Sequence, residues 1–162
     1  MIAFDAVSVQ AWPTMAEEFK DRRILRSYFP QGSAQGVRVI KIPPEWTWQV
    51  EPVKRILECL SLPDNWNSYG GHSSSYDAAL VAIDFLSVVP FDNPPRPRVV
   101  PLPSGGIQLE WSKGQRELDV EFRPDGSIVF LKVQGDSEGE EGKLASFTST
   151  HVNSLVSWLV TR

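Results

Sequence analysis

Hydrophobic and polar residues alternate along three short runs between Gly105 and Val133. The runs are separated by Ser-Lys-Gly-Gln and by Arg-Pro-Asp-Gly, and both tetrapeptides are typical of turns. Such alternation predicts strands, because successive side chains of a strand point to opposite faces of a sheet. The stretch therefore predicts an antiparallel β-meander. Its first two strands direct one apolar set to a common core: Ile107, Leu109, Trp111, Leu118, Val120 and Phe122.

The first turn also predicts how its two strands pair. A four-residue loop at 112–115 brings three pairs together on one face. The pairs are Trp111 with Arg116, Leu109 with Leu118, and Ile107 with Val120. In this register the Arg116 guanidinium can stack on the Trp111 ring.

The third run allows two registers after the turn at 123–126. A four-residue loop turns Val129, Leu131 and Val133 toward the core. A bulged three-residue loop turns Ile128 and Phe130 toward it instead. In both cases apolar side chains remain on the opposite face. We therefore expect this strand to be covered on both sides, by its own chain or by another chain.

Helices are predicted before and after the meander in the chain, and we expect them to cover one face of the sheet. Residues 54–60, 75–88 and 150–161 carry apolar residues three or four positions apart, with Ser74 as the cap of the second helix. The segment 98–102 predicts an edge strand, because Pro101 cannot donate a ladder hydrogen bond. The acidic segment 135–142 predicts a mobile loop, and 144–147 a short strand.

The first 50 residues predict a separate N-terminal arm. Thr14 to Tyr28 has a capping-box arrangement and a rough apolar stripe, which favour a helix, and the segment 36–42 alternates as a strand does. The fold class predicted is α+β. An antiparallel meander packs against two or three helices in a core domain over 51–162, and the arm of one helix and one strand covers 1–50.

Composition narrows the function classes. The 162-residue chain has a formal net charge of -4, which argues against broad binding to nucleic acid or to anionic membranes. One cysteine, Cys59, excludes an internal disulfide and fits a reducing cytoplasm, and its helical position favours a packing role over a nucleophile. No apolar run approaches the roughly 20 residues that span a bilayer. The N-terminus lacks a secretory signal pattern. We therefore expect a cytoplasmic protein.

Several aromatic residues are candidates for core packing or for partner binding. Trp46 and Trp48 follow a Pro-Pro pair, and we favour a core role for them. The segment 62–72 contains Asp, Asn, Ser and Gly, which favour an ordered loop pinned to the domain by Trp66 and Tyr69.

The basic cluster of the arm favours a solvated helix face over contact with an acidic protein or a phosphate backbone. It consists of Lys20, Arg22, Arg23 and Arg26.

The same loop offers the best candidates for catalysis. His72 has the chemistry of a base, and Ser73, Ser74 and Ser75 that of a nucleophile. However, no strand leads into a Gly-x-Ser-x-Gly elbow, and serines before a helix are expected as caps. His151 lies at another helix start, and neither histidine has metal-ligand spacing. We therefore assign no catalytic residue, no metal and no cofactor.

Carboxylates occupy the outer face of the predicted meander. Glu110 is expected opposite Glu117, and like charges directly opposite each other are unfavourable. A solvated face, a basic partner or arm, and a catalytic metal remain as alternatives, in that order of preference. The set is Glu110, Glu117, Asp119 and Glu121.

Two motifs carry a resemblance. The first is Leu-Pro-Asp-Asn-Trp-Asn-Ser-Tyr-Gly at 62–70, and the second is Gly-Gly-Ile-Gln-Leu-Glu-Trp at 105–111. Together they resemble a family of small uncharacterised bacterial proteins with Asn-Trp-Asp-x-Tyr-Gly-Ala and Gly-Gly-Ile-Gln-Leu-Glu-Trp motifs, over about residues 54–133. This chain has Asn67 in place of the aspartate and Gly71 in place of the alanine. The resemblance implies a bacterial accessory role and no catalytic residue.

The leading hypothesis is therefore a non-enzymatic, protein-binding accessory module of an antitoxin-like, defence or mobile-element system. The partner is another protein, a homo-oligomer is left open, and nucleic acid or membrane is not expected. A small metal-dependent hydrolase or nuclease on the carboxylate face is one alternative, and a nucleic-acid-binding protein using the basic arm is another. The partner-binding candidates are Trp46, Trp48, Trp66, Tyr69, Ile128 and Phe130.

Overall fold

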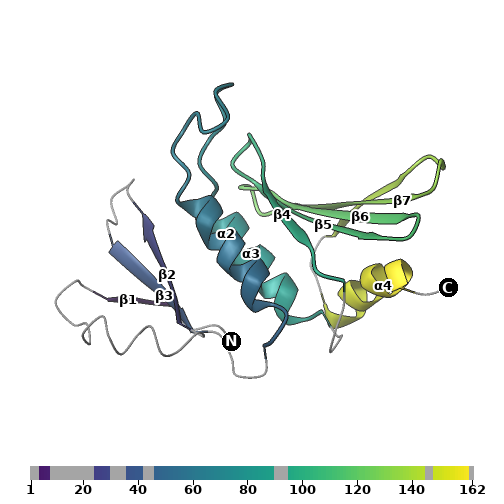
Figure 1. The fold of residues 1–162 in the computed structure, drawn as a ribbon, viewed down its shortest axis with the longest axis horizontal. Coiled ribbons are helices and arrows are strands. Elements are labelled where there is room, and N and C mark those ends of the chain that lie inside the picture. The colour runs from purple at the N-terminus through teal and green to yellow at the C-terminus, as the bar shows by residue number, and fades with distance from the viewer. Residues whose placement is uncertain are drawn as a thin grey trace.

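The computed structural model describes residues 46–89, 95–144 and 148–160, together with the backbone of three N-terminal strands. Five strands form an antiparallel sheet in sequence order, as predicted for a meander (Figure 1). Strand β4, which contains Pro101, lies at the edge of the sheet. Proline is tolerated there, because an edge strand has a side on which no N–H donor is needed. The strands are β4 (Arg98–Pro101), β5 (Ile107–Lys113), β6 (Arg116–Phe122), β7 (Ile128–Gln134) and β8 (Glu140–Leu144).

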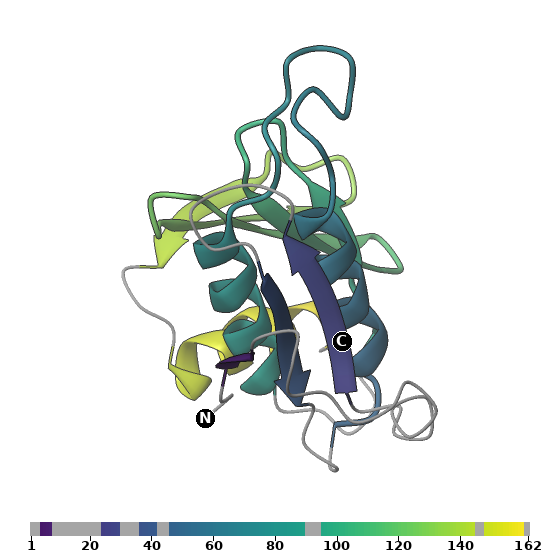
Figure 2. The ribbon, with the colours of Figure 1, turned by 90° about the vertical axis from the view of Figure 1, so that its left-hand side faces the viewer.

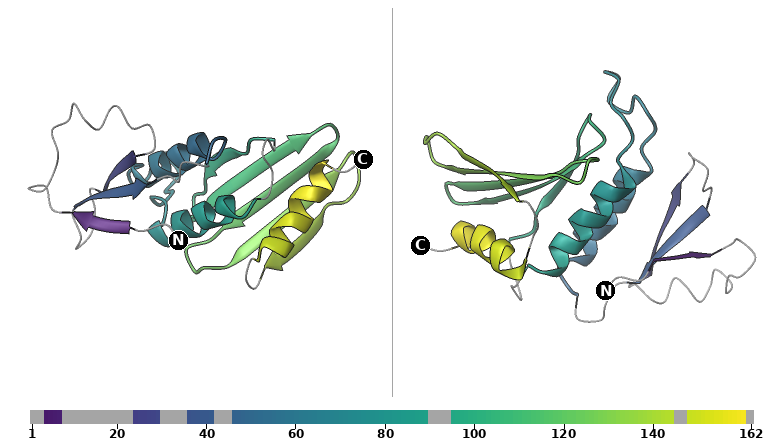
Figure 3. Two further views of the ribbon diagram at one scale, coloured as in Figure 1. Left: turned by 90° about the horizontal axis from the view of Figure 1, so that it is seen from below. Right: turned by 180° about the vertical axis from the view of Figure 1, so that it is seen from behind.

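The described helices all lie on one side of this sheet (Figure 3). They are α2 (Val50–Leu60), α3 (Tyr76–Ser87) and α4 (Ser149–Val160). Helices α3 and α4 contact the central strands β5 and β6, and α2 contacts β4. This arrangement confirms the α+β fold with helices packed on a meander. No helix among the described residues is both long and apolar enough to cross a membrane.

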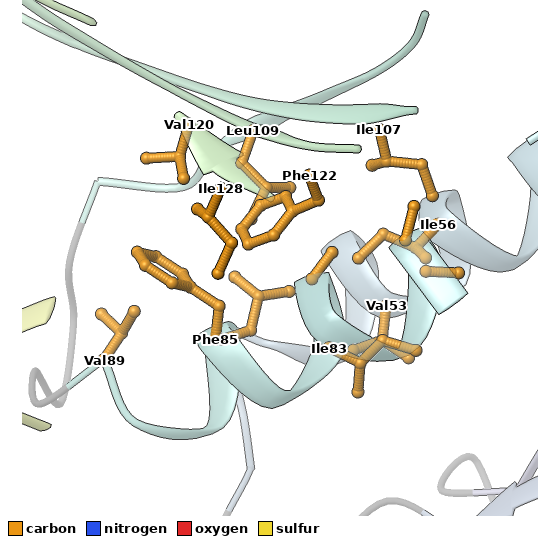
Figure 4. Packing of buried hydrophobic residues seen from close by; sticks show 14 of the residues in the cluster. Val53, Ile56, Ile83, Phe85, Val89, Ile107, Leu109, Val120, Phe122 and Ile128 are labelled. Atoms are coloured by element: carbon orange, nitrogen blue, oxygen red, sulfur yellow. The ribbon is translucent and has the colours of Figure 1, made fainter. Parts of the chain in front are cut away.

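The core lies between the sheet and the helices, and it includes Phe85 of α3 (Figure 4). The Phe85 ring centroid lies 5.4 Å from that of Phe122 and 6.2 Å from that of Trp111. All three side chains are at most 1% exposed. Edge-on aromatic contacts of this kind add to the stabilisation that burial provides. The alternating residues of β5 and β6 therefore face the helices, as predicted.

The register predicted for the first hairpin was wrong by two residues. Trp111 lies opposite Leu118, and Lys113 lies opposite Arg116, so only two residues form the loop. Gly114 takes a positive φ of 64°, which a two-residue hairpin loop requires and which glycine tolerates. Arg116 consequently does not reach Trp111. Its guanidinium lies 5.4 Å from the ring centroid of Trp158 in α4 and donates to the Trp158 carbonyl at 2.5 Å.

The second hairpin settles which face of β7 is buried. Ile128 lies opposite Phe122 and Phe130 lies opposite Val120, so both point to the core face. This outcome agrees with the bulged alternative and excludes the four-residue loop. Val129, Leu131 and Val133 therefore lie on the other face of the sheet.

The acidic segment after β7 is not entirely a loop, contrary to the prediction for 135–142. Strand β8 begins at Glu140 and pairs with β7 along its whole length. Glycine at position 142 permits this pairing, because a Cβ there would collide with the Phe130 ring. Backbone pairing and this aromatic cover outweigh the low β-propensity of the segment. Residues 145–147 of the strand predicted at 144–147 lie outside the described residues.

Three strands of the N-terminal arm form a second antiparallel sheet in the order β1-β3-β2. The strand predicted at 36–42 is confirmed as β3 (Gly36–Lys41). The helix predicted to Tyr28 is wrong over β2 (Ile24–Phe29), because this β-branched and aromatic segment pairs with β3. Residues 14–23 lie outside the described residues. Strand β1 spans Phe4–Val7, and β2 contacts α2 on the side away from the large sheet (Figure 2).

Candidate functional site

Three loops meet at one end of the large sheet, at residues 61–75, 102–106 and 123–127. The backbone N–H of His72 donates to the Pro103 carbonyl at 2.9 Å, and that of Ser75 donates to the Gly105 carbonyl at 2.7 Å. A Cβ on Gly105 would lie 3.6 Å from the Pro124 ring. We call this region the three-loop end. It joins the two sequence motifs, which are more than thirty residues apart in the chain.

Side chains of the 61–75 loop hold its own backbone. Asn67 Oδ1 accepts from the N–H groups of Tyr69 and Gly71, both at 2.9 Å. Asn65 Oδ1 accepts from the Gly70 N–H at 2.8 Å. Asp and Asn side chains form such local bonds readily, which is why they favour ordered turns. The loop is therefore closed by its own side chains.

Asp64 closes the base of the same loop. Its Oδ1 accepts from the Ser73 N–H at 2.9 Å. Hydrogen bonds from the Ser73 N–H and side chain, with a smaller electrostatic contribution from His72, hold the pKa of the Asp64 carboxyl below its ordinary value. The carboxylate is thus already engaged with the Ser73 backbone.

Trp66 and Tyr69, both predicted to pin the loop to the domain, have different roles in the structure. Trp66 is half-buried and its Nε1 donates to the His72 carbonyl at 3.0 Å, so it pins the loop as expected. Tyr69 does not pin the loop, because its side chain is 93% exposed. The loop therefore presents Tyr69 to solvent. The 61–75 loop projects well beyond the helices and the sheet (Figure 2).

The remaining partner-binding candidates lie against the core. Trp48 and Ile128 are buried, with 4% of each residue exposed. Trp46 and Phe130 are partly buried and pack on the same cluster. These four residues contribute to stability, and little of their surface is available to a partner. Among the six candidates, Tyr69 is the most exposed.

The basic candidates of the arm cannot be placed in the same detail. Lys20, Arg22 and Arg23 lie outside the described residues. Arg26 lies in β2, opposite Val39 of β3.

The four predicted carboxylates share the face of the sheet that is opposite the helices, which we call the outer face. Glu110 lies opposite Asp119, not opposite Glu117 as predicted, because of the two-residue shift in register. Arg98 of β4 donates to Glu110 from both Nε, at 2.7 Å, and a terminal guanidinium nitrogen. Arg123 pairs with Glu121 at 2.9 Å. Two of the four carboxylates therefore already have a cationic partner.

Asp119 lies at the centre of the outer face. Partial burial, and then the negative charges of Glu110 and Glu117, raise the pKa of its carboxyl, while Arg98 opposes this shift. Within the described residues neither Asp119 nor Glu117 has an ion pair. The outer face thus keeps two carboxylates whose charge is not neutralised by a contacting cation.

Two shallow grooves run over the outer face, and Asp119 lines both of them. The larger has a volume of about 540 Å³ and lies over β4, β5 and β6, between Arg96 and Glu117. The smaller has a volume of about 240 Å³ and includes Val129 and Leu131 of β7. Leu131 is 37% exposed. Val129 is only 5% exposed, so the carboxylate surface borders directly on the exposed Leu131.

The serines proposed as nucleophiles have structural positions. Ser75, not Ser74 as predicted, caps α3 and accepts from the Ala78 N–H at 3.5 Å. The Ser74 hydroxyl is buried and has no hydrogen-bond partner among the described residues. His151 is exposed at the start of α4, where its N–H donates to Thr148 Oγ1 at 3.3 Å. In the described part of the chain no three His, Cys, Asp or Glu side chains converge as metal ligands.

Cys59 is buried in α2. Burial, and then the charge of Glu58, raise the pKa of its thiol to about 11. The thiol is therefore protonated at neutral pH, which agrees with the packing role expected from the sequence.

Comparisons with known proteins give no further guide: no family model, no curated protein and no solved structure matches the chain. The site must therefore be interpreted from its own geometry. Sequence reasoning missed the meeting of the three loops. Each loop carried a turn signal, but no signal in the sequence indicated that they would contact one another.

Proposed function

We propose that this protein is a non-enzymatic binding module that docks on another protein through the outer face of its large sheet. The observation that carries the proposal is that β7 is apolar on both sides. Ile128 and Phe130 face the helices, whereas Val129, Leu131 and Val133 face outward. Val129 is only 5% exposed, so the accessible part of this outward set is Leu131 and the partly buried Val133. Within the described residues no helix or strand lies over the outer side of the sheet (Figure 1). Apolar strips beside polar residues are a common feature of protein interfaces.

The charges of the outer face favour a cationic partner segment. Asp119 and Glu117 have no ion pair with any residue that the structure describes, and a Lys or Arg side chain placed between them would relieve their mutual repulsion. Apolar residues of the same segment would cover Leu131. The partner best suited to this face therefore combines basic and apolar side chains. The resemblance to small bacterial proteins supports an accessory role in an antitoxin-like or defence-associated system.

The geometry favours this function over hydrolysis on the same carboxylates. Glu110 accepts from Arg98 and Gln108, and Glu121 accepts from Arg123, so both are oriented by neighbouring side chains. The excess of acids on this face also disfavours a phosphate backbone as its ligand.

Affinity purification from the natural host tests the proposal. The wild-type protein is expected to retain a stoichiometric protein partner. The double variant Glu117→Arg with Leu131→Arg should lose this partner, because it reverses the charge and removes the apolar contact. Both positions are exposed, so the fold should tolerate the changes.

A matched control adds the same charge elsewhere. Glu58→Arg with Ser154→Arg changes exposed positions on α2 and α4, away from the outer face, and should retain the partner. Loss of the partner in both double variants would indicate a general charge effect. Retention of the partner in both, or a partner-free monomer for the wild type, would rule out docking through the outer face.

A further inference from the structure

The three-loop end has a feature that the outer face does not explain. Tyr69 and Leu131 are the large hydrophobic side chains exposed among the described residues, and only Leu131 lies on the sheet. Tyr69 is 93% exposed. A tyrosine at a loop tip normally has freedom to fold back on the surface and bury its ring. Here the backbone on both sides of Tyr69 is fixed.

Positive φ angles and hydrogen bonds hold the backbone on both sides of Tyr69. Ser68 and Gly70 have positive φ angles of 63° and 81°, and Asn65 has one of 62°. Positive φ is unfavourable for residues other than glycine and persists only where the surroundings enforce it. Asn67 holds the N–H groups of Tyr69 and Gly71 at 2.9 Å. The ring is therefore directed outward by a loop that is already ordered.

Ordering before binding has a thermodynamic consequence. A partner that contacts Tyr69 does not have to restrict the loop, so less conformational entropy is lost on association. Tyrosine also supplies a large contact area with few rotatable bonds, which is why it is frequent among interface hot spots.

We propose that the 61–75 loop is a preformed docking finger, whose Tyr69 ring inserts into an uncharged pocket of a folded protein partner. This surface is distinct from the outer face, and the proposal does not depend on docking there. The pocket would be apolar and would offer a hydrogen-bonding group to the phenol hydroxyl.

The lack of basic residues in the loop favours a protein partner over a nucleic acid or a membrane. The loop contains no Lys or Arg, and its only acid is Asp64, whose carboxylate accepts from the Ser73 N–H. Neither a nucleic acid nor an anionic membrane surface would be attracted to such a tip, because both are bound largely through basic side chains. The tip residues around Tyr69 are neutral amides and hydroxyls, which suit the polar rim of a protein pocket.

Site-specific photocrosslinking in the natural host tests the proposal. A photoreactive phenylalanine analogue at position 69 of the full-length chain should form one discrete protein adduct on illumination. The same analogue at position 113 should not form it. Lys113 is also exposed, but it lies in the hairpin at the other end of β5.

Competition makes the test quantitative. Unlabelled wild-type protein should suppress the adduct, and Tyr69→Ala should require at least about thirtyfold more protein to do so, the loss that marks a hot-spot residue. Asn67→Ala keeps the ring and removes two bonds that order the loop, so it should require about threefold to tenfold more. Asn153→Ala, on α4, is the matched control and should compete as the wild type does.

Several results would overturn the proposal. These are an adduct with nucleic acid, lipid or a second copy of the chain, equal competition by Tyr69→Ala, or no adduct above that from position 113. The variant Glu117→Arg with Leu131→Arg separates the two surfaces. If it loses a co-purified partner while position 69 forms no adduct, the docking finger is wrong and docking through the outer face stands.

Discussion

At the scale of single residues, two aspartates illustrate opposite effects of environment. Asp64 is solvent-exposed, and hydrogen bonds from Ser73 stabilise its charged form. Asp119 is partly buried beside Glu110 and Glu117, so its charged form is disfavoured. The sequence places both in polar surroundings, and only the folded structure distinguishes them.

These opposite shifts predict opposite effects of neutralisation at pH 7. Asp119→Asn should raise the free energy of unfolding, because the folded state no longer holds a disfavoured charge. Asp64→Asn should lower the free energy of unfolding, because the folded state stabilises the charged Asp64 carboxylate through hydrogen bonds from Ser73. Urea unfolding of the two variants and the wild type at several pH values measures both differences.

The pH dependence follows from the direction of each shift. A raised folded-state pKa means that Asp119 weakens stability above that pKa and has no such effect below the ordinary value of about 4. A lowered folded-state pKa means that Asp64 adds stability above about pH 4, which is lost as the pH falls through the folded-state pKa. Both differences from wild type should therefore shrink on acidification. Differences that do not change with pH would contradict this account.

At the scale of elements, the start of α3 shows how adjacent serines differ. Ser75 accepts from the Ala78 N–H, whereas the hydroxyl of Ser74 is buried and has no partner in the part of the chain that the structure describes. Both satisfy the sequence rule for a helix cap, and the sequence assigned the role to Ser74. The structure assigns it to Ser75, because the Ser75 backbone is extended, with φ of -68° and ψ of 138°, and its side chain reaches the Ala78 N–H.

Alanine substitution distinguishes the two serines. Ser75→Ala should lower the free energy of unfolding by about 1 kcal/mol, the typical value for a lost N-cap. Ser74→Ala should be neutral or slightly stabilising, because it removes a buried hydroxyl that has no hydrogen bond. Chemical unfolding monitored by tryptophan fluorescence measures both. The reverse order of effects would show that Ser74 is the cap.

At the scale of the whole molecule, the hydrophobic cluster indicates which part of the chain forms the core domain. Its buried members extend from Trp48 to Leu159 and include residues from both the large sheet and the helices. Strand β2 of the arm contacts α2 on the side away from the large sheet. The boundary near residue 50 expected from the sequence stays a prediction.

The fragment 46–162 should fold without the arm. We expect a single cooperative thermal transition, somewhat below that of the full chain because the contacts between β2 and α2 are lost. Calorimetry and near-ultraviolet circular dichroism of both proteins test this expectation. A fragment without a cooperative transition would show that the N-terminal sheet is part of the folding unit.

The sequence by itself determined the features that depend on local pattern. The alternation in β5 and β6 identified the buried face, and apolar spacing identified α2, α3 and α4, because both signals have the period of the backbone geometry. The same reasoning failed at Ile24–Phe29, where pairing with β3 outweighed a weak helical pattern.

Only the tertiary structure decided the features that depend on contacts between distant segments. The two-residue shift of the first hairpin moved Asp119 opposite Glu110, and a register cannot be fixed by alternation alone, because a shift of two residues keeps every face unchanged. The exposure of Tyr69 depends on hydrogen bonds within its loop and between that loop and Pro103 and Gly105. Composition cannot encode such pairings, so the candidate surfaces became visible only when these segments were brought together in the fold.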